Sequence, residues 1–405
     1  MKALRALCLC LSISSASAFE VDEIFDRLDN ALTFSEFHDN LRVRLSGTLD
    51  LEVYDFDQPA PELIDSKIDD LFNPRLTLFV DAQYGSQIYF FAQSRLDRGF
   101  DPSDHGAQFR IDEYALRFTP LENGSFNFQI GKFATVVGNW VPRHLSWENP
   151  FVDAPIVYES VTPVSDKSAP ASPLDFVNRF DHGKYAFTPV IWGPNYTTGA
   201  SISGRVEQFD YAVEMKNAAL SSRPGSWNIG DNGFDDPAFN GRVGFRPNEA
   251  WNFGVSAGEG VYFRPEAEQT LPRGRDIDDY REFLIGQDVS FAMHHLQIWA
   301  EFYEARFEVP RVGDANTFAY YLEAKYKLTP QLFAALRWNQ QIFSKVDNGM
   351  GGTLRWSQDL AKIDIAAGYR FNSYMQLKMQ YSFQQETTGP EDHNHIFAAQ
   401  FTVRF

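Results

Sequence analysis

The sequence predicts an all-β fold, a transmembrane antiparallel β-barrel of about 16 strands with one long inward-folded loop after strand 5. Three observations lead to this class. Apolar and polar residues alternate in many short segments, and the connections between these segments alternate between short and long. Aromatic residues make up 15% of the chain although charged residues reach 22%. The strands of a membrane barrel turn half of their side chains to lipid and half to water, so such a chain looks only half apolar.

The beginning of the chain reads as a secretory signal. Residues 1-18 combine basic residues, a short apolar run and a small-residue end, which predicts cleavage after Ala18. Cys8 and Cys10, the only two cysteines of the sequence, lie in this segment. We therefore expect a mature chain without a thiol, a disulfide or a cysteine-based metal site.

The formal net charge of the 405 residues is -18. Lys2 and Arg5 belong to the predicted signal, so the mature chain is more acidic still. Nucleic acid needs a basic footprint, so this balance argues against nucleic acid as a partner. An acidic, well-solvated surface explains most of these carboxylates.

Residues 19-40 differ from the rest of the chain. Their apolar residues stand at near-helical spacing among many acids, which predicts a periplasmic amphipathic helix before the barrel. The apolar face could line the barrel, contact a neighbouring subunit or another envelope protein, or pack locally. The apolar residues concerned are Val21, Ile24, Phe25, Leu28 and Leu32.

A period of two begins at residue 41 and predicts a barrel over 41-405. In "NLRVRLSGTLDLEV" the apolar residues fall on one face and the charged residues on the other. The apolar face is expected to contact lipid, and the charged face to line water. The predicted strands are 41-53, 75-84, 86-97, 108-119, 125-133, 196-206, 208-217, 238-246, 250-261, 282-292, 294-306, 317-328, 331-344, 361-371, 374-386 and 394-405.

The connections give an independent test of the strand count. With the first strand ascending from the periplasm, seven turns at the lower end are short, while most of the loops at the other end are long. Bacterial barrels show this asymmetry, whereas a soluble sandwich has no reason for it. We assign 351-358 to a loop, because a seventeenth strand would place the tail on the wrong side. The N- and C-termini are then both periplasmic.

The loop over 134-195 is far longer than the others and rich in aromatic and β-branched residues. A segment of this composition is poorly solvated in water, so we expect it to pack inside the barrel. A lumen of 16 strands is wide enough to admit it. Trp140 and Trp147 are expected to pack this loop rather than to bind sugar.

The tail "HNHIFAAQFTVRF" ends on alternating apolar residues and a terminal aromatic. With the signal, the even strand count, the loop asymmetry and the position of the long loop, it makes the chain similar to the bacterial outer-membrane porin superfamily. The resemblance implies a homotrimer in the outer membrane, constricted by the long loop. It also implies a tail that serves as an assembly signal for the barrel-assembly machinery, carried by Phe397, Phe401, Val403 and Phe405.

A narrower resemblance concerns "IGKFATVVGNW" and "WENPF", which look similar to the substrate-selective branch that includes phosphate-selective porins. The acidic net charge departs from the basic funnel that an anion-selective pore requires. Net charge does not decide lumen charge, because loops and mouths carry many of the acids. Anion or cation preference therefore stays open.

The polar phase of the strands and the long loop supply candidate constriction residues. An arginine cluster that faces loop carboxylates would set a transverse field, and rings of charged side chains set selectivity. Alternatively, each arginine pairs with a lumen carboxylate and only holds the wall or the loop. The candidates are Arg42, Arg44, Arg75, Arg95, Arg110, Arg117, Arg143, His144, Glu148, Asp153, Glu159 and Asp166.

The sequence therefore predicts a porin, a passive diffusion channel for small hydrophilic solutes or ions, and not an enzyme. The alternatives are a barrel enzyme of the lipase or protease type and a plugged structural or adhesive barrel. No cofactor is expected, although "DNGFDDP" and "RDIDDY" could collect Ca²⁺ or Mg²⁺ at the surface. The paired histidines at 294-295 and 393-395 are expected to be solvated turn residues.

Overall fold

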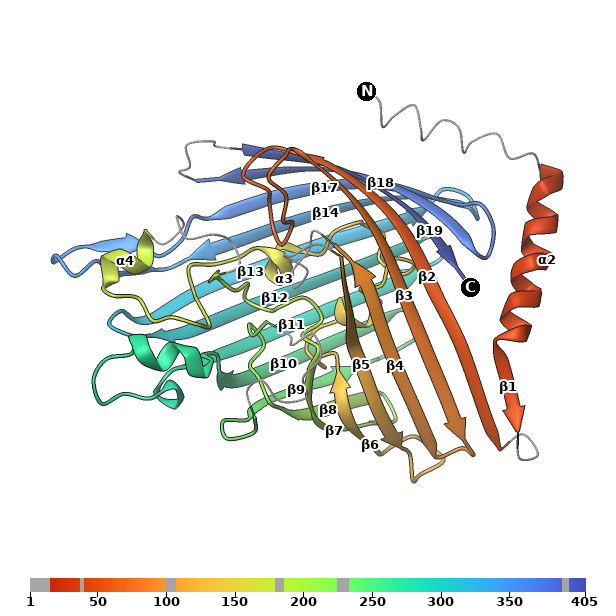
Figure 1. The fold of residues 1–405 in the computed structure, drawn as a ribbon, viewed down its shortest axis with the longest axis horizontal. Coiled ribbons are helices and arrows are strands. Elements are labelled where there is room, and N and C mark those ends of the chain that lie inside the picture. The colour runs from red at the N-terminus through yellow and green to blue at the C-terminus, as the bar shows by residue number, and fades with distance from the viewer. Residues whose placement is uncertain (1–14, 37–39, 99–106, 179–185, 224–232, 388–392) are drawn as a thin grey trace.

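The computed structural model describes residues 15–36, 40–98, 107–178, 186–223, 233–387 and 393–405. Sixteen antiparallel strands form one closed sheet, because the last strand pairs with the first strand of the barrel (Figure 1). The predicted fold class is confirmed. The strands are β2 (Leu41–Phe56), β3 (Asp70–Tyr84), β4 (Ile88–Asp97), β5 (Gln108–Phe118), β6 (Asn127–Phe133), β7 (Thr197–Val206), β8 (Phe209–Lys216), β9 (Ala238–Phe245), β10 (Trp251–Val261), β11 (Arg281–Met293), β12 (Leu296–Val309), β13 (Gly313–Lys327), β14 (Leu332–Phe343), β17 (Leu360–Arg370), β18 (Met375–Glu386) and β19 (His393–Arg404).

The connections fall into two sets, which define a short-turn end and a long-loop end of the barrel. The connection over 307–316 between two predicted strands is a short turn, because β12 and β13 continue to pair up to Val309 and Gly313. β3 also starts five residues before its predicted start, and it includes Pro74. β4 pairs with β3 only from Leu76 onward, so Pro74 lies where one side of the strand has no neighbour, and such an edge tolerates proline.

The segment 351–358 lies outside the barrel sheet. Its strand β16 (Thr353–Arg355) pairs with β15 (Lys345–Asp347) in a separate two-stranded sheet within the loop after β14. The even strand count depends on this arrangement, since a barrel with a seventeenth strand would end at the other side.

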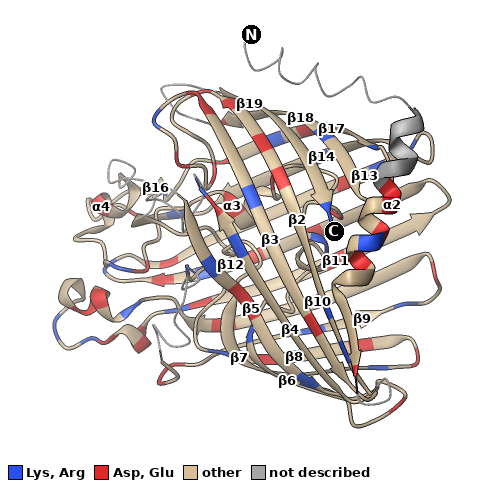
Figure 2. Ribbon diagram, turned by 45° about the vertical axis from the view of Figure 1, so that its right-hand side comes forward, with Lys and Arg blue, Asp and Glu red and all other residues tan. Residues whose placement is uncertain are grey.

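The two faces of the barrel wall differ in chemistry. Outward positions carry exposed aliphatic side chains such as Ile130, Val213 and Ile285, each more than half exposed. Inward positions carry polar and charged side chains, many of them buried, and Figure 2 shows charges of both signs along β2 to β5. This is the alternation that a wall between lipid and a polar interior requires.

The N-terminal segment lies at the short-turn end (Figure 1). It consists of helix α2 (Ser15–Ala31) and strand β1 (Thr33–Glu36), which pairs with the beginning of β2. An ion pair of 2.9 Å joins Asp29 of α2 to Arg44, and the ring of Phe25 stacks on Tyr374 at 5.0 Å. The helix therefore contacts the barrel rim.

None of the helices in the described ranges combines the length and the apolar character needed to cross a membrane.

The chain end closes the barrel next to a glycine. Phe405 and Gly47 exchange two backbone hydrogen bonds of 3.0 and 2.9 Å. A Cβ atom at Gly47 would lie 2.6 Å from the Phe405 ring, so the ring occupies the space that a side chain would fill. Phe397, Phe401 and Val403 lie on the outward face of β19, while Gln400 and Thr402 bind Glu52 and Asp50 inside.

The long loop enters the barrel and forms much of its core. It contains the short helices η2 (Val141–Arg143), α3 (Ile156–Glu159) and α4 (Pro173–Val177). Its apolar side chains pack with the inner faces of β11 to β14 and with the loop that holds η5 (Pro265–Thr270) and η6 (Ile277–Asp279). The resulting apolar core includes Tyr158, Phe176, Tyr303, Phe307 and Trp356, all at most 1% exposed.

Candidate functional site

The inward loop is attached to the barrel wall first through two buried glutamates. Glu301 of β12 accepts hydrogen bonds from the Trp140 backbone at 2.8 Å and from the Tyr158 hydroxyl at 2.6 Å. Glu323 of β13 lies 2.5 Å from the Arg143 guanidinium, which also stacks over Trp299 at 4.4 Å. These contacts fix the first part of the loop against β12 and β13.

A second attachment joins the middle of the loop to β14 and β17. Asp153 lies 2.6 Å from the Lys362 ammonium and also contacts the Arg337 guanidinium. Arg337 is 2.7 Å from Asp364, and Lys362 also binds Glu62 of the loop after β2. Both cations are fully buried, so each needs these carboxylates to offset its desolvation.

A buried lysine makes the third attachment. The Lys378 ammonium donates hydrogen bonds to the carbonyls of Ser146, Asn149 and Phe151 at 2.8 to 2.9 Å. An ammonium has three donors, and here three loop carbonyls accept them. In the same part of the loop, the Trp147 ring contacts the guanidinium groups of Arg370 and Arg404 at 4.9 and 4.2 Å. The loop is therefore held in one arrangement by charge and by stacking.

The opposite wall, formed by β2 to β5, carries three arginines that alternate with carboxylates. We call Arg75, Arg95 and Arg110 the arginine wall. Arg75 lies 2.6 Å from Glu52, Arg95 lies 2.8 Å from Asp112, and Arg110 binds Asp97 through two nitrogens at 2.6 and 3.0 Å. Each arginine of the wall is thus paired with a carboxylate of the same wall.

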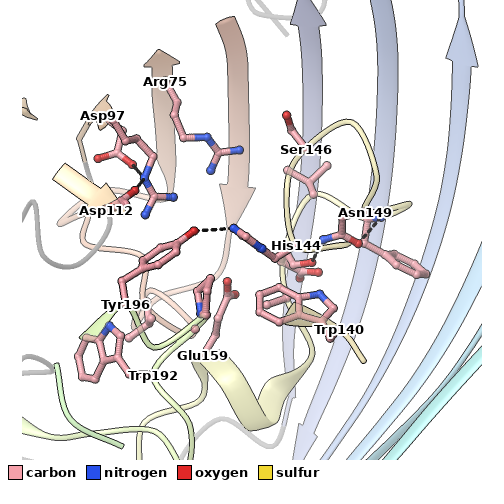
Figure 3. Close-up of a pocket in the computed structure, with 18 of the residues that line it drawn as sticks. Arg75, Asp97, Asp112, Trp140, His144, Ser146, Asn149, Glu159, Trp192 and Tyr196 are labelled. Carbon is pink, nitrogen blue, oxygen red and sulfur yellow. Dashed lines mark hydrogen bonds and ion pairs between the residues drawn. The ribbon is translucent and has the colours of Figure 1, made fainter. Parts of the chain in front are cut away.

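A cavity of about 110 Å³ lies between the loop and the arginine wall (Figure 3). Its lining combines guanidinium groups and carboxylates with aromatic rings. The residues are Tyr54, Leu63, Arg75, Arg95, Asp97, Arg110, Asp112, Trp140, His144, Ser146, Asn149, Phe151, Val152, Asp153, Ala154, Glu159, Trp192, Gly193, Pro194 and Tyr196.

A hydrogen bond between His144 and Tyr196 crosses this cavity. His144 Nε2 lies 2.5 Å from the Tyr196 hydroxyl, and Nδ1 lies 2.5 Å from the Val141 carbonyl. The carbonyl can only accept, so Nδ1 carries the proton and Nε2 accepts from the tyrosine. Burial lowers the pKa of His144, which belongs to the loop and not to a spanning strand, to about 4. In Figure 3, Arg75 lies on one side of this bond and Glu159 on the other.

Glu159 is a loop carboxylate beside Glu62, with which it shares a hydrogen bond. Its Oε2 atom is buried and has no hydrogen-bond partner among the described residues. Burial, followed by the neighbouring Glu62 and Asp153, raises the pKa of Glu159 well above its usual range. The cavity therefore has an arginine-rich side and a side where carboxylates outnumber nearby cations.

The predicted constriction residues separate into two groups. Six of them line the cavity: Arg75, Arg95, Arg110, His144, Asp153 and Glu159. The other six lie elsewhere. Arg42 and Arg44 are exposed at the short-turn end, Glu148 is exposed, Arg117 binds Gln129 at 2.9 Å, Arg143 anchors the loop, and Asp166 pairs with Arg264 at 2.9 Å.

Several residues that shape the site were not singled out from the sequence. Lys362 and Asp364 stand in the polar phase of "LAKIDIAAG", so strand periodicity alone carried their signal. Glu62 lies in a loop and had no periodic signal, since its role depends on a long-range contact with Lys362. Tyr196 and Trp192 also line the cavity only through tertiary packing, because they lie at the C-terminal end of the long loop.

Within the described part of the chain, no group of three or more His, Cys, Asp or Glu side chains is arranged to hold a metal ion. His393 and His395 lie at the start of β19, where their rings are 5.5 Å apart, and the Tyr381 hydroxyl lies 2.6 Å from His395 Nδ1.

Comparison with known proteins gave structural matches only. No protein-family model and no curated protein matches the sequence. OmpT, an outer membrane protein of Vibrio cholerae, matches with a TM-score of 0.54 and 11% identity over 92% of this chain and 100% of that chain. An anion-selective porin from Comamonas acidovorans gives a TM-score of 0.55 at 10% identity over 90% and 100%. OmpF of Salmonella typhi gives 0.55 at 11% identity over 92% and 100%. The chain has the porin-like fold of an outer-membrane β-barrel.

Proposed function

We propose that this protein is an outer-membrane porin, a passive channel for small hydrophilic solutes or ions whose path runs between the inward loop and the arginine wall. The cavity of about 110 Å³ at that place carries the proposal. Its lining has both charge signs and aromatic faces, as a selective constriction requires. The neighbouring structures include an anion-selective porin, which supports a transport role.

In this proposal, solutes cannot pass through the part of the barrel that the apolar core fills. The apolar core around Tyr158, Phe176 and Trp356 fills the space next to β11 to β14, and apolar packing of this density leaves no room for hydrated ions. The proposed solute path therefore passes this core on the side of β2 to β5, and a further cavity of about 600 Å³, lined by Asn252, Ser290 and Trp299 among others, lies at the short-turn end. A narrow path predicts a conductance well below that of a 16-stranded barrel with an open lumen.

Location and assembly belong to the same proposal. We place the chain in the outer membrane as a homotrimer, with both termini in the periplasm and residues 1-18 removed. One of the structural neighbours is described in a trimer form, which supports this assembly. Chemical crosslinking of the purified protein in detergent tests the trimer, and a single band at the monomer mass would count against it.

Conductance in planar bilayers tests the proposal. Discrete, long-lived current steps are expected, and ion-substituted reversal potentials then give the anion or cation preference. Substitution of phosphate for chloride tests the narrower resemblance to phosphate-selective porins. Protein that is folded, inserted and silent would overturn the porin proposal.

The apolar core also supports a second candidate, a plugged structural or adhesive barrel. The observation in its favour is that loop side chains such as Phe176 and Trp356 stack at the long-loop end of the barrel at 5.7 Å with no exposure. The two candidates differ in one measurement. A plugged barrel gives no steps and no uptake of solutes into proteoliposomes, whereas the porin gives both.

A further inference from the structure

The cavity holds hydrogen-bonding groups that the described residues leave unused. Trp140 is 4% exposed, and its Nε1 donor has no partner among these residues. Arg95 also lines the cavity, and its Nε atom lies 2.8 Å from Asp112. On the other side, Glu159 Oε2 has no hydrogen-bond partner among these residues, while the same carboxyl shares a hydrogen bond with Glu62. Buried groups of this kind cost free energy unless a solute or water satisfies them.

These groups are arranged by charge. The donors belong to Arg75, Arg95 and Trp140, while the free acceptor belongs to Glu159, which lies across the His144–Tyr196 hydrogen bond from Arg75 (Figure 3). A solute that satisfies both sides needs an anionic end and a cationic end on one short frame. A guanidinium binds a carboxylate in a planar, bidentate way, and a carboxylate binds an ammonium.

We propose that this cavity is a binding site for a small zwitterion of the α-amino acid type, with the carboxylate at Arg75 and Arg95 and the ammonium at Glu159. The proposal rests on the proposed porin function and names its solute class. The volume limits the solute to a small molecule. A cavity of about 150 Å³ can hold benzene, and this cavity of about 110 Å³ is smaller.

Solutes of one charge satisfy the site less well. The three cations of the arginine wall already face Asp50, Glu52, Asp97 and Asp112, so the wall has no excess positive charge to concentrate simple anions. Glu159 lies beside Glu62 and Asp153, and these carboxylates repel an anion and attract an added positive charge. An ammonium supplies that charge in place of a proton.

Four solutes on a similar three-carbon frame test the proposal. Uptake into proteoliposomes that contain the full chain is compared for L-alanine, propionate, isopropylammonium and lactamide, with the membrane potential clamped. L-Alanine carries both charges, the next two carry one each, and lactamide carries none. We expect L-alanine uptake to be saturable and roughly tenfold faster than that of each analogue, which corresponds to about 1.4 kcal/mol.

Two variants locate the preference. Glu159→Gln removes the carboxyl whose proton the ammonium would replace, and Arg95→Gln removes the charge that would face the carboxylate. Each is expected to reduce the preference for L-alanine to within about twofold of lactamide. Glu122→Gln in a short turn and Arg273→Gln in a long loop remove the same charges at exposed positions and should leave the preference unchanged. Heat-dependent migration in gels shows whether each variant is folded.

The wild-type protein decides the outcome even where a variant fails to fold. Channels that conduct ions but take up the four solutes at similar rates would overturn the zwitterion site and leave the porin proposal intact. In that case water alone satisfies the unpaired groups. Absence of both conductance and uptake would overturn the porin proposal together with the site.

Discussion

Lys362 Nζ lies 2.6 Å from Asp153 Oδ2, across 209 positions of sequence, and this ion pair joins the wall of the barrel to the inward loop. Both side chains lie in a fully buried network with Arg337, Asp364 and Glu62. Such a network holds the loop in one place only while its charges stay balanced.

Lys362→Met should therefore be strongly destabilising. It removes the cation that faces Asp153, Asp364 and Glu62, and breaking a buried ion pair in this way costs about 3–5 kcal/mol. The free energy of unfolding is measured by tryptophan fluorescence in urea, with Lys327→Met at an exposed position of β13 as the control. Equal midpoints for the two variants would show that the network does not hold the loop.

Gly47→Ala tests the closure of the barrel. Its Cβ atom would lie 2.6 Å from the Phe405 ring and 2.9 Å from the Thr77 carbonyl, so the terminal ring has to move. We expect a smaller folded fraction in gel-shift assays and slower insertion into vesicles. Gly241→Ala in β9 is the matched control, since a Cβ there meets its first neighbour at 3.4 Å. Similar folding of both variants would contradict the role of the glycine.

The His144–Tyr196 hydrogen bond predicts a pH dependence. The pKa of His144 is lowered from 6.5 to about 4 by burial. As the pH falls, the imidazole therefore takes up its proton in the unfolded chain at a higher pH than in the folded chain. Stability should therefore decrease between pH 6.5 and 4, by at most about 3 kcal/mol from this group, and stay level on both sides of that window. His144→Gln, which keeps a hydrogen-bonding side chain but does not titrate, should remove this decrease. Parallel curves for the two proteins would refute the assignment.

Trp356→Ala tests whether the apolar core lies outside the solute path. Trp356 is fully buried, stacks on Phe176 and donates to the Asn316 carbonyl at 2.8 Å, so its loss should cost about 3–5 kcal/mol. Reversal potentials should remain those of the wild type, because the charged lining is untouched. Trp338→Ala on the outward face is the control for loss of a tryptophan. A changed ion preference in Trp356→Ala would move the path to the core side.

The fold was largely readable from the sequence because the period-two pattern reports the two faces of every strand directly. Strand ends were less well predicted. β3 begins before Pro74 and β12 continues to Val309, because each strand keeps its hydrogen-bonded neighbour beyond the residues that alternate clearly. The site was readable only in part. Arg75, Arg95 and Arg110 follow from strand phase. The anchoring role of Arg143 could not be predicted, because it depends on how the loop packs against Glu323 and Trp299.

The central claim, that solutes pass between the inward loop and the arginine wall, is tested most directly by a thiol placed in that space. Cys8 and Cys10 are the only cysteines of the sequence, so with both replaced Ser146→Cys is a unique thiol on the cavity lining. Ser357→Cys, in the loop after β14, is the control. A charged methanethiosulfonate reagent should reduce the single-channel current of Ser146→Cys and leave that of Ser357→Cys unchanged. Complete modification at Ser146→Cys with an unchanged current would contradict the claim.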